Sequence, residues 1–145
     1  WLDGLTPLKV KIADVGETPC PGVVYLPPVD RHLEIRQRRL WHSRAEEVCN
    51  QRPSGSVLFH SMAREYGSLA VGALLTGMGA DGAEGLLAMR KAGAYTIAED
   101  ASTCVVYGMP AAAAEMGAAC EVLPLPSVAR RLVELVDARR REART

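Results

Sequence analysis

The residues whose types and spacing suit chemistry lie together in one glycine-rich loop that contains a carboxylate. Gly77-Met78-Gly79-Ala80-Asp81-Gly82 follows a small, apolar segment and precedes a helical pattern. The letters match G-x-G-x-x-G, in which glycines let the backbone approach a diphosphate and a helix N-terminus stabilises its charge. Glu99-Asp100 ends the next apolar segment, about twenty residues further on, as the dinucleotide pattern requires. A nicotinamide or flavin site is therefore one interpretation of this loop.

Asp81 favours a different use of the loop. Its carboxylate lies where a diphosphate would lie, and two unit charges ~4 Å apart repel by about 4 kcal/mol at an effective dielectric near 20. A helix N-terminus instead stabilises a functional carboxylate. A buried, ionised Asp at the end of a strand is the usual orienting partner of a catalytic histidine. The structural alternative is that Asp81 caps the helix expected over residues 83–92.

Alternating helices and strands are expected to position this loop. From residue 57 onward the hydrophobic pattern predicts the order helix, strand, helix, strand, helix, strand, helix. Such alternation implies a Rossmann-like α/β fold, a parallel sheet with helices on both faces, in which ligands bind beyond the carboxyl ends of the strands. Loop 76–82 lies at such an end. Strands are predicted at 70–75 and 94–98, both buried, and at 121–125. A first helix is expected to be capped by Ser54 or Ser56 and to end near Gly67. Further helices are expected over 83–92 and 109–116, and a final helix has an apolar stripe over 128–136.

The first fifty residues have a different pattern, which predicts two strands and a β-hairpin. Strands are expected at 9–13 and 23–26, and the hairpin at 32–35 and 39–42. The length of 145 residues fits one domain. We expect that domain to comprise a strand and hairpin region (1–50), alternating helices and strands (51–137) and an Arg-rich tail (138–145).

Composition argues against several classes of protein. The 48% hydrophobic fraction excludes intrinsic disorder, and no apolar run approaches the ~20 residues of a membrane span. Seventeen basic and seventeen acidic side chains cancel, which indicates neither a nucleic-acid partner nor insertion into a membrane. Four cysteines show no spacing typical of a zinc site, so we expect reduced thiols, no metal and a cytoplasmic protein; they are Cys20, Cys49, Cys104 and Cys120.

Further segments carry recognisable motifs in the same order as a known family. Leu75 to Leu86 contains Leu-Thr-Gly-Met-Gly-x-Asp-Gly, and Pro21 to Leu33 contains Pro-Gly-x-x-Tyr-x-x-Pro followed by a histidine. Arg52 to Ser61 and Ser102 to Pro110 add Arg-Pro-Ser-x-x-x-Leu-Phe-x-Ser and a Tyr-Gly-Met-Pro ending. Together these segments resemble the chemotaxis protein-glutamate methylesterase family, the CheB type, over roughly residues 9 to 136.

The resemblance implies a serine esterase of α/β fold that uses no cofactor. Such an enzyme removes methyl groups from glutamate methyl esters on chemoreceptors, releasing methanol, and deamidates receptor glutamines. The family's triad is Ser, His and Asp in chain order, and its Asp matches Asp81, the catalytic residue expected here. Asp81 would fix the tautomer of the histidine and stabilise the imidazolium. The loop backbone near Met78 would help to stabilise the oxyanion with N–H groups.

Two motifs of the family have no counterpart in the sequence. They are the Gly-x-Ser-x-Gly-Gly turn that carries the nucleophile and the Gln-His-Met segment that carries the histidine. The resemblance therefore implies that the amino-terminal part of the domain is missing, that this chain alone is inactive, and that a receiver domain precedes it in the family. Gln51 and Ser56 also depart from the family, which often has His and Asp at these positions.

No other residue is expected to replace the nucleophile or the histidine. Ser102 belongs to a motif that the family has in any case. Ser61 follows His60, but adjacent helical side chains point in different directions, so His60 is expected to pack or cap. We expect His42 at the surface and His32 on a surface strand, with a place in the cleft as the alternative for His32.

The expected partners are the cytoplasmic helices of methylated chemoreceptors and a second copy of the chain. Without the first strands of the domain, the edge of the strand over 70–75 would be uncovered, and pairing with another copy through a two-fold contact would cover it. Two alternatives remain open at this stage: a catalytically dead remnant kept for interaction or dimerisation, and a dinucleotide-binding module.

Overall fold

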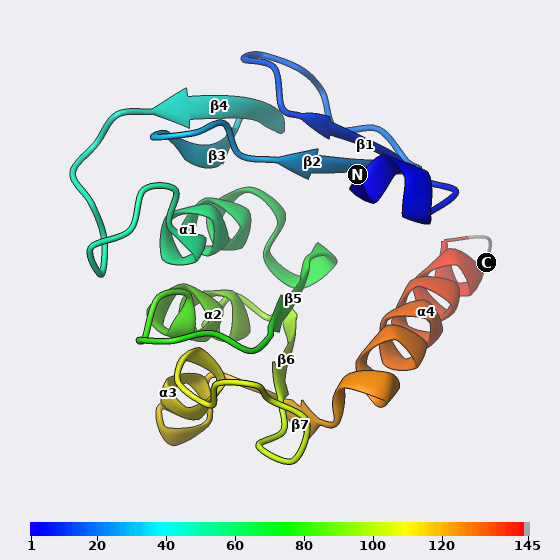
Figure 1. The fold of residues 1–145 in the computed structure, drawn as a ribbon. Coiled ribbons are helices and arrows are strands. Elements are labelled where there is room, and N and C mark those ends of the chain that lie inside the picture. The colour runs from blue at the N-terminus through cyan, green and yellow to red at the C-terminus, as the bar shows by residue number, and fades with distance from the viewer. Residues whose placement is uncertain (144–145) are drawn as a thin grey trace.

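A parallel sheet carries the glycine loop. The structure, a computed structural model, describes residues 1–143. Its three-stranded sheet has the order β5-β6-β7, with Val71 opposite Tyr95 and Ile97 opposite Glu121. Helices α2 and α3 cover one face and α4 lies on the other, which confirms the predicted α/β fold (Figure 1). The bounds are β5 (Val71–Leu74), α2 (Ala83–Lys91), β6 (Tyr95–Glu99), α3 (Met109–Glu115), β7 (Glu121–Leu123) and α4 (Leu125–Glu142).

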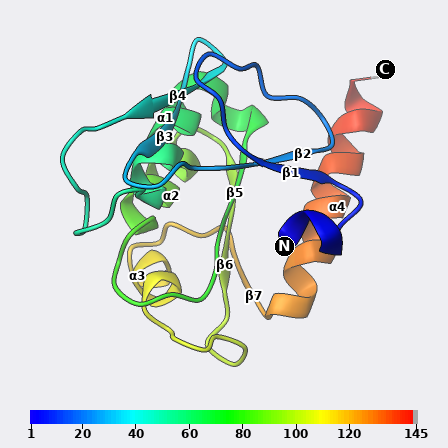
Figure 2. The same ribbon diagram turned by 45° about the horizontal axis from the view of Figure 1, so that its top comes forward.

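The amino-terminal region forms two separate two-stranded sheets. One pair is parallel and the other is the predicted antiparallel hairpin, which turns at Gln37 and Arg38, both with positive φ. Positive φ at both central residues is the geometry that matches the twist of the flanking strands. A short 3₁₀ helix, η1, precedes the first strand and lies on the side of α4 in both views (Figures 1 and 2). The bounds are η1 (Leu2–Leu5), β1 (Lys9–Ile12), β2 (Val23–Leu26), β3 (His32–Arg36) and β4 (Arg39–Ser43).

Helix α1 (Gly55–Tyr66) joins the two regions. Its N-cap is Ser54, one of the two serines expected there, and the Ser54 hydroxyl accepts a hydrogen bond from the Val57 N–H. Gly67, at φ 49°, ends the helix before a short 3₁₀ turn, η2 (Gly67–Leu69). One face of α1 packs on the hairpin through Leu58 and Met62. The other face packs on α2.

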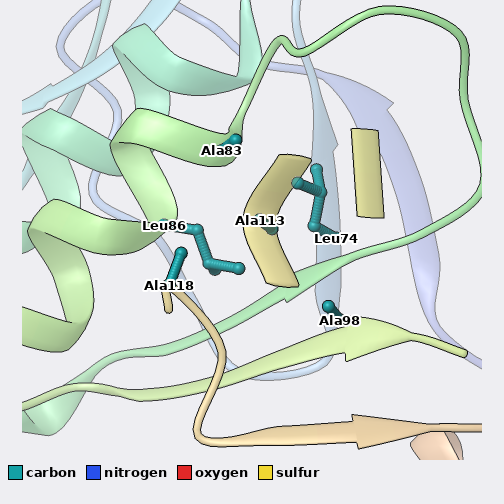
Figure 3. Packing of buried hydrophobic residues seen from close by; sticks show 6 residues of the cluster. All are labelled: Leu74, Ala83, Leu86, Ala98, Ala113 and Ala118. Carbon is teal, nitrogen blue, oxygen red and sulfur yellow. The ribbon is translucent and has the colours of Figure 1, made fainter. Parts of the chain in front are cut away.

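The core beneath the glycine loop is built largely from small side chains. Leu86 and Ala113 are fully buried, and Leu74 is nearly so. Alanines at the contacts allow helix and sheet to approach closely, which holds the start of α2 against the end of β5. Figure 3 shows the members of this cluster: Leu74, Ala83, Leu86, Ala98, Ala113 and Ala118.

Two features of the structure differ from the sequence-based expectations. Strand β5 is not buried on both faces: its residues alternate between buried and half-buried, because α2 covers one face while α4 contacts β6. Helix α4 continues to Glu142, so most of the expected Arg-rich tail is helical. Arg139 on this helix donates hydrogen bonds to the carbonyls of Ser68, Leu69 and Ala70, which ties α4 to the start of β5. Among residues 1–143, no helix is long and apolar enough to cross a membrane.

Candidate active site

Close packing of two helices brings Asp81 to the N-terminus of α1. Asp81 lies in the loop between β5 and α2, and Gly85 lies in the first turn of α2. A Cβ on Gly85 would lie 2.7 Å from both the Phe59 Cβ and the Ser56 carbonyl oxygen. Only a glycine allows α2 to approach α1 this closely. The loop residue before α2 consequently faces the open end of α1.

Three hydrogen bonds hold the Asp81 carboxylate at that helix end. Oδ1 accepts from the Ser54 hydroxyl at 2.6 Å and from the Ser56 N–H at 3.2 Å. Oδ2 accepts from the Gly55 N–H at 2.7 Å. Asp81 is 8% exposed, so these donors replace most of the water around its carboxylate. The partial positive charge of a helix N-terminus adds to their stabilisation of the anion.

The hydrogen-bond pattern leaves Asp81 one unused acceptor position. Each carboxylate oxygen has two lone pairs. Both lone pairs of Oδ1 are used, and one of Oδ2 remains free. The alternative role as a cap of α2 is wrong, because the N-cap of α2 is Gly82, with no side-chain cap. Asp81 caps the neighbouring helix instead and keeps one oxygen available to a further donor.

His32 contacts this hydrogen-bond network through the backbone of Ser54. Its ring is fully buried; Nδ1 accepts from the Ser54 N–H at 3.2 Å, and Nε2 lies 3.0 Å from the Glu46 carbonyl oxygen. A ring that accepts at Nδ1 carries its proton at Nε2, which then donates to the Glu46 carbonyl. The expectation of a surface strand residue was wrong. Because α1 starts against β3, the first residue of that strand is covered.

Ser56 ties the glycine loop to α1 from the other side. While its N–H donates to Asp81, its hydroxyl accepts from the Gly82 N–H at 2.8 Å. The Gly82 N–H is one of the first donors of α2, the group that a diphosphate would require. Because Ser56 uses this donor, the geometry argues against the dinucleotide interpretation of the loop.

The loop between β6 and α3 holds the glycine loop in place at the end of the sheet. The Gly77 N–H donates to the Val106 carbonyl and the Gly77 carbonyl accepts from the Met109 N–H. The buried carboxylate of Glu99 accepts from the Thr76 N–H at 2.7 Å. Among the described residues, the N–H group of Met78 has no acceptor. A free N–H on a braced loop is suited to binding an oxyanion.

Comparison with known proteins agrees with this geometry. The family described as CheB methylesterase matches residues 1–132. A protein-glutamate methylesterase/protein-glutamine glutaminase of Paramagnetospirillum magneticum is 58% identical over 135 residues, 93% of this chain and 38% of the relative. The chain belongs to the CheB methylesterase family. A relative of the same name from Shigella flexneri is 45% identical over 94% of this chain and 40% of its own length. The chain thus spans about two fifths of these curated relatives.

The CheB methylesterase fold is also found among solved structures. The crystal structure of the Thermotoga maritima CheB methylesterase catalytic domain superposes with a TM-score of 0.87 at 37% sequence identity. The match covers 92% of this chain and 73% of that one. The arrangement of the two regions of this chain is therefore that of the family.

Other nucleophile candidates in this CheB-family chain are engaged elsewhere or held protonated. The Ser102 hydroxyl donates to Asp100, and this bond lowers the pKa of the Asp100 carboxyl. Burial, together with the nearby Glu99 carboxylate, raises the pKa of the Cys104 thiol, which therefore stays protonated at neutral pH. The Ser61 hydroxyl donates to the Leu58 carbonyl. All four cysteines are free thiols.

The remaining histidines lie outside the site. His60 is exposed on α1, so the expectation that it packs or caps was wrong. His42 is half-buried rather than at the surface, and its Nε2 has no partner among the described residues. Among residues 1–143, no serine hydroxyl donates to a histidine ring. The sequence did not show that Ser54 contacts Asp81 or that His32 contacts Ser54. The signal that was available is that both residues fall within motifs shared with the family.

Proposed function

We propose that this chain supplies the aspartate and the oxyanion loop of a protein-glutamate methylesterase that is also a protein-glutamine glutaminase. The observation that carries the proposal is the geometry of Asp81: a buried carboxylate at the carboxyl end of a parallel sheet, held by three donors, with one free lone pair on Oδ2. The 58% identity to an enzyme of that name supports the same assignment.

In the proposed reaction Asp81 accepts a hydrogen bond from Nδ1–H of a catalytic histidine. Nε2 of that histidine removes the proton of a serine hydroxyl, whose oxygen attacks the side-chain carbonyl of a glutamate methyl ester or a glutamine. The N–H of Met78 stabilises the oxyanion. The histidine then protonates the leaving methoxide or amide nitrogen, giving methanol or ammonia. Water hydrolyses the acyl-enzyme by the same steps, which leaves glutamate.

The serine and histidine of this reaction come, in our proposal, from family segments that have no counterpart here. His32 does not qualify, because both of its ring nitrogens already have partners. We therefore expect residues 1–145 alone to release no methanol, since an orienting aspartate without nucleophile and base retains little rate enhancement.

The proposed partners follow from the proposed activity. The substrates are the cytoplasmic helices of methylated chemoreceptors, which places the protein in the cytoplasm, and a receiver domain in the same polypeptide would regulate access. A second copy of this chain would pair along the free edge of β5. This edge contact is supported by the strand order, because among the described residues β6 is the one strand that pairs with β5.

The proposal is tested by methanol release from methyl-esterified receptor fragments, measured with the full-length protein. We expect Asp81→Asn to lower turnover by about a thousandfold or more, because an amide favours the wrong histidine tautomer and carries no charge. Glu84→Gln is the matched control, since Glu84 is an exposed carboxylate three residues away. Turnover of Asp81→Asn within a few-fold of wild type would remove Asp81 from the mechanism.

A further inference from the structure

We propose that Ser54 is a positioning residue for Asp81, and that His32 holds Ser54 in place. The inference rests on the proposed function, which it deepens by naming the groups that aim the carboxylate. Ser54 and His32 are both buried, and they come from α1's N-cap and from β3, two elements that precede the glycine loop in the chain.

The contacts of Ser54 fix the direction of its hydroxyl proton. Oγ accepts from the Val57 N–H at 3.4 Å, so its own proton is free to point elsewhere. The hydroxyl lies 2.6 Å from Asp81 Oδ1, the shortest of the three bonds to this carboxylate. A hydroxyl donating to a charged oxygen at this distance is among the stronger hydrogen bonds in proteins. Ser54 therefore holds Oδ1, which leaves the free lone pair on Oδ2.

His32 fixes the backbone from which the Ser54 side chain extends. The ring is held at both nitrogens, by the Glu46 carbonyl and by the Ser54 N–H. A proton on Nδ1 would face the Ser54 N–H, donor against donor, so the neutral ring is the form that fits. His32 does not reach Asp81 itself. Its effect on the carboxylate is through Ser54.

Loss of the Ser54 hydroxyl would leave Oδ1 with one donor, the Ser56 N–H at 3.2 Å. The carboxylate would then be held mainly through Oδ2 by Gly55. Rotation about that remaining short bond would move the free lone pair away from the catalytic histidine. A displacement of about 1 Å in a reacting constellation costs up to about a hundredfold in rate.

The experiment compares four variants in the full-length protein by methanol release from methyl-esterified receptor fragments. Ser54→Ala is expected to lower kcat by about tenfold to a hundredfold with KM little changed. Ser54→Thr keeps a hydroxyl and is expected to restore most of kcat. His32→Asn keeps an acceptor near the position of Nδ1, so its kcat is expected to exceed that of the similarly sized His32→Leu. Equal kcat in His32→Asn and His32→Leu would overturn the proposal that His32 holds Ser54 in place.

A matched control separates positioning from helix stability. Ser61 is a fully buried serine of α1 whose hydroxyl bonds to Leu58 and Ile35 and not to Asp81. Ser61→Ala is expected to lower the thermal transition while leaving kcat unchanged. If kcat falls as far in Ser61→Ala as in Ser54→Ala, destabilisation of α1 explains both results, and the orientation of the Asp81 carboxylate does not. That outcome would overturn the inference.

A double-mutant cycle then shows whether Ser54 acts through Asp81. In an Asp81→Ala background, Ser54→Ala is expected to cause no further loss, whereas an undiminished loss would overturn the inference. If the wild-type protein releases no methanol, the proposed function fails, and a crystal structure of Ser54→Ala decides the inference by itself. A carboxylate turned from its wild-type orientation supports positioning, and an unchanged carboxylate contradicts it.

Discussion

Gly85 sets the distance between α1 and α2, and the position of Asp81 depends on that distance. The residue has an ordinary helical backbone, so its role is not a special turn but the space that a side chain would fill. Its neighbours are the Phe59 Cβ and the backbone of Ser56, neither of which is the movable end of a side chain. Any side chain here would push α2 from α1, and Asp81 would move with α2.

A Gly85→Ala substitution is therefore expected to destabilise the fold by about 1–3 kcal/mol, the range seen for overpacked cores. Urea unfolding followed by circular dichroism measures the change. Gly4→Ala is the control, because a Cβ at Gly4 meets nothing within 4 Å. Equal midpoints for wild type and Gly85→Ala would show that the two helices tolerate a wider separation.

At the scale of single residues, the sequence predicted the place of Asp81 between a strand and a helix but not the groups that surround it. The position of Asp81 follows from a local pattern, a carboxylate in a glycine loop between strand and helix. Its partners Ser54 and Gly55 are about 26 residues earlier in the chain, and they meet Asp81 only because α1 packs on α2. Local pattern cannot show which of two nearby helix ends a carboxylate caps, and the structure gives α1 rather than α2.

At the scale of elements, local signals were strong enough to place nearly every helix and strand. Pro27-Pro28 stops β2 where predicted, and Gly117, at φ 65°, follows α3 where a stop was expected. Pairings between elements were harder to foresee. The parallel contact of β1 with β2 has no signal in either short strand, since it depends on a crossover of the chain. The partial exposure of β5 depends likewise on which helices reach it.

The free edge of β5 leads to a prediction about association. Because β5 pairs with no strand but β6 within residues 1–143, we expect residues 1–145 to elute as a dimer or larger in size-exclusion chromatography with light scattering. Val71→Lys, a charge on this strand, is expected to favour the monomer, whereas Val29→Lys, at an exposed valine elsewhere, is not. A monomer with a cooperative thermal transition for the unchanged chain would contradict edge pairing.

At the scale of the whole molecule, residues from both regions of the chain line one hollow. It measures about 460 Å³ and has a mainly apolar lining, which includes Tyr25, Leu58, Val71 and Val136. In the part of the chain that the structure describes, β2 of the amino-terminal region and β5 of the three-stranded sheet each have one edge without a neighbouring strand. The Thermotoga maritima domain superposes on this chain with a TM-score of 0.87, and about a quarter of its own chain lies outside the match. We expect family segments that have no counterpart in this chain to bring the catalytic serine and histidine toward Asp81.

Asp81, held by α1, is expected to present Oδ2 to the catalytic histidine. The most direct measurement is a crystal structure of the full-length protein, in which the distances from this histidine to the Asp81 oxygens are read. We predict Nδ1 at about 2.6–3.2 Å from Oδ2, with Oδ1 still bound by Ser54. A histidine that bonds to Oδ1, to Glu99 or to neither carboxylate would contradict this role of Asp81.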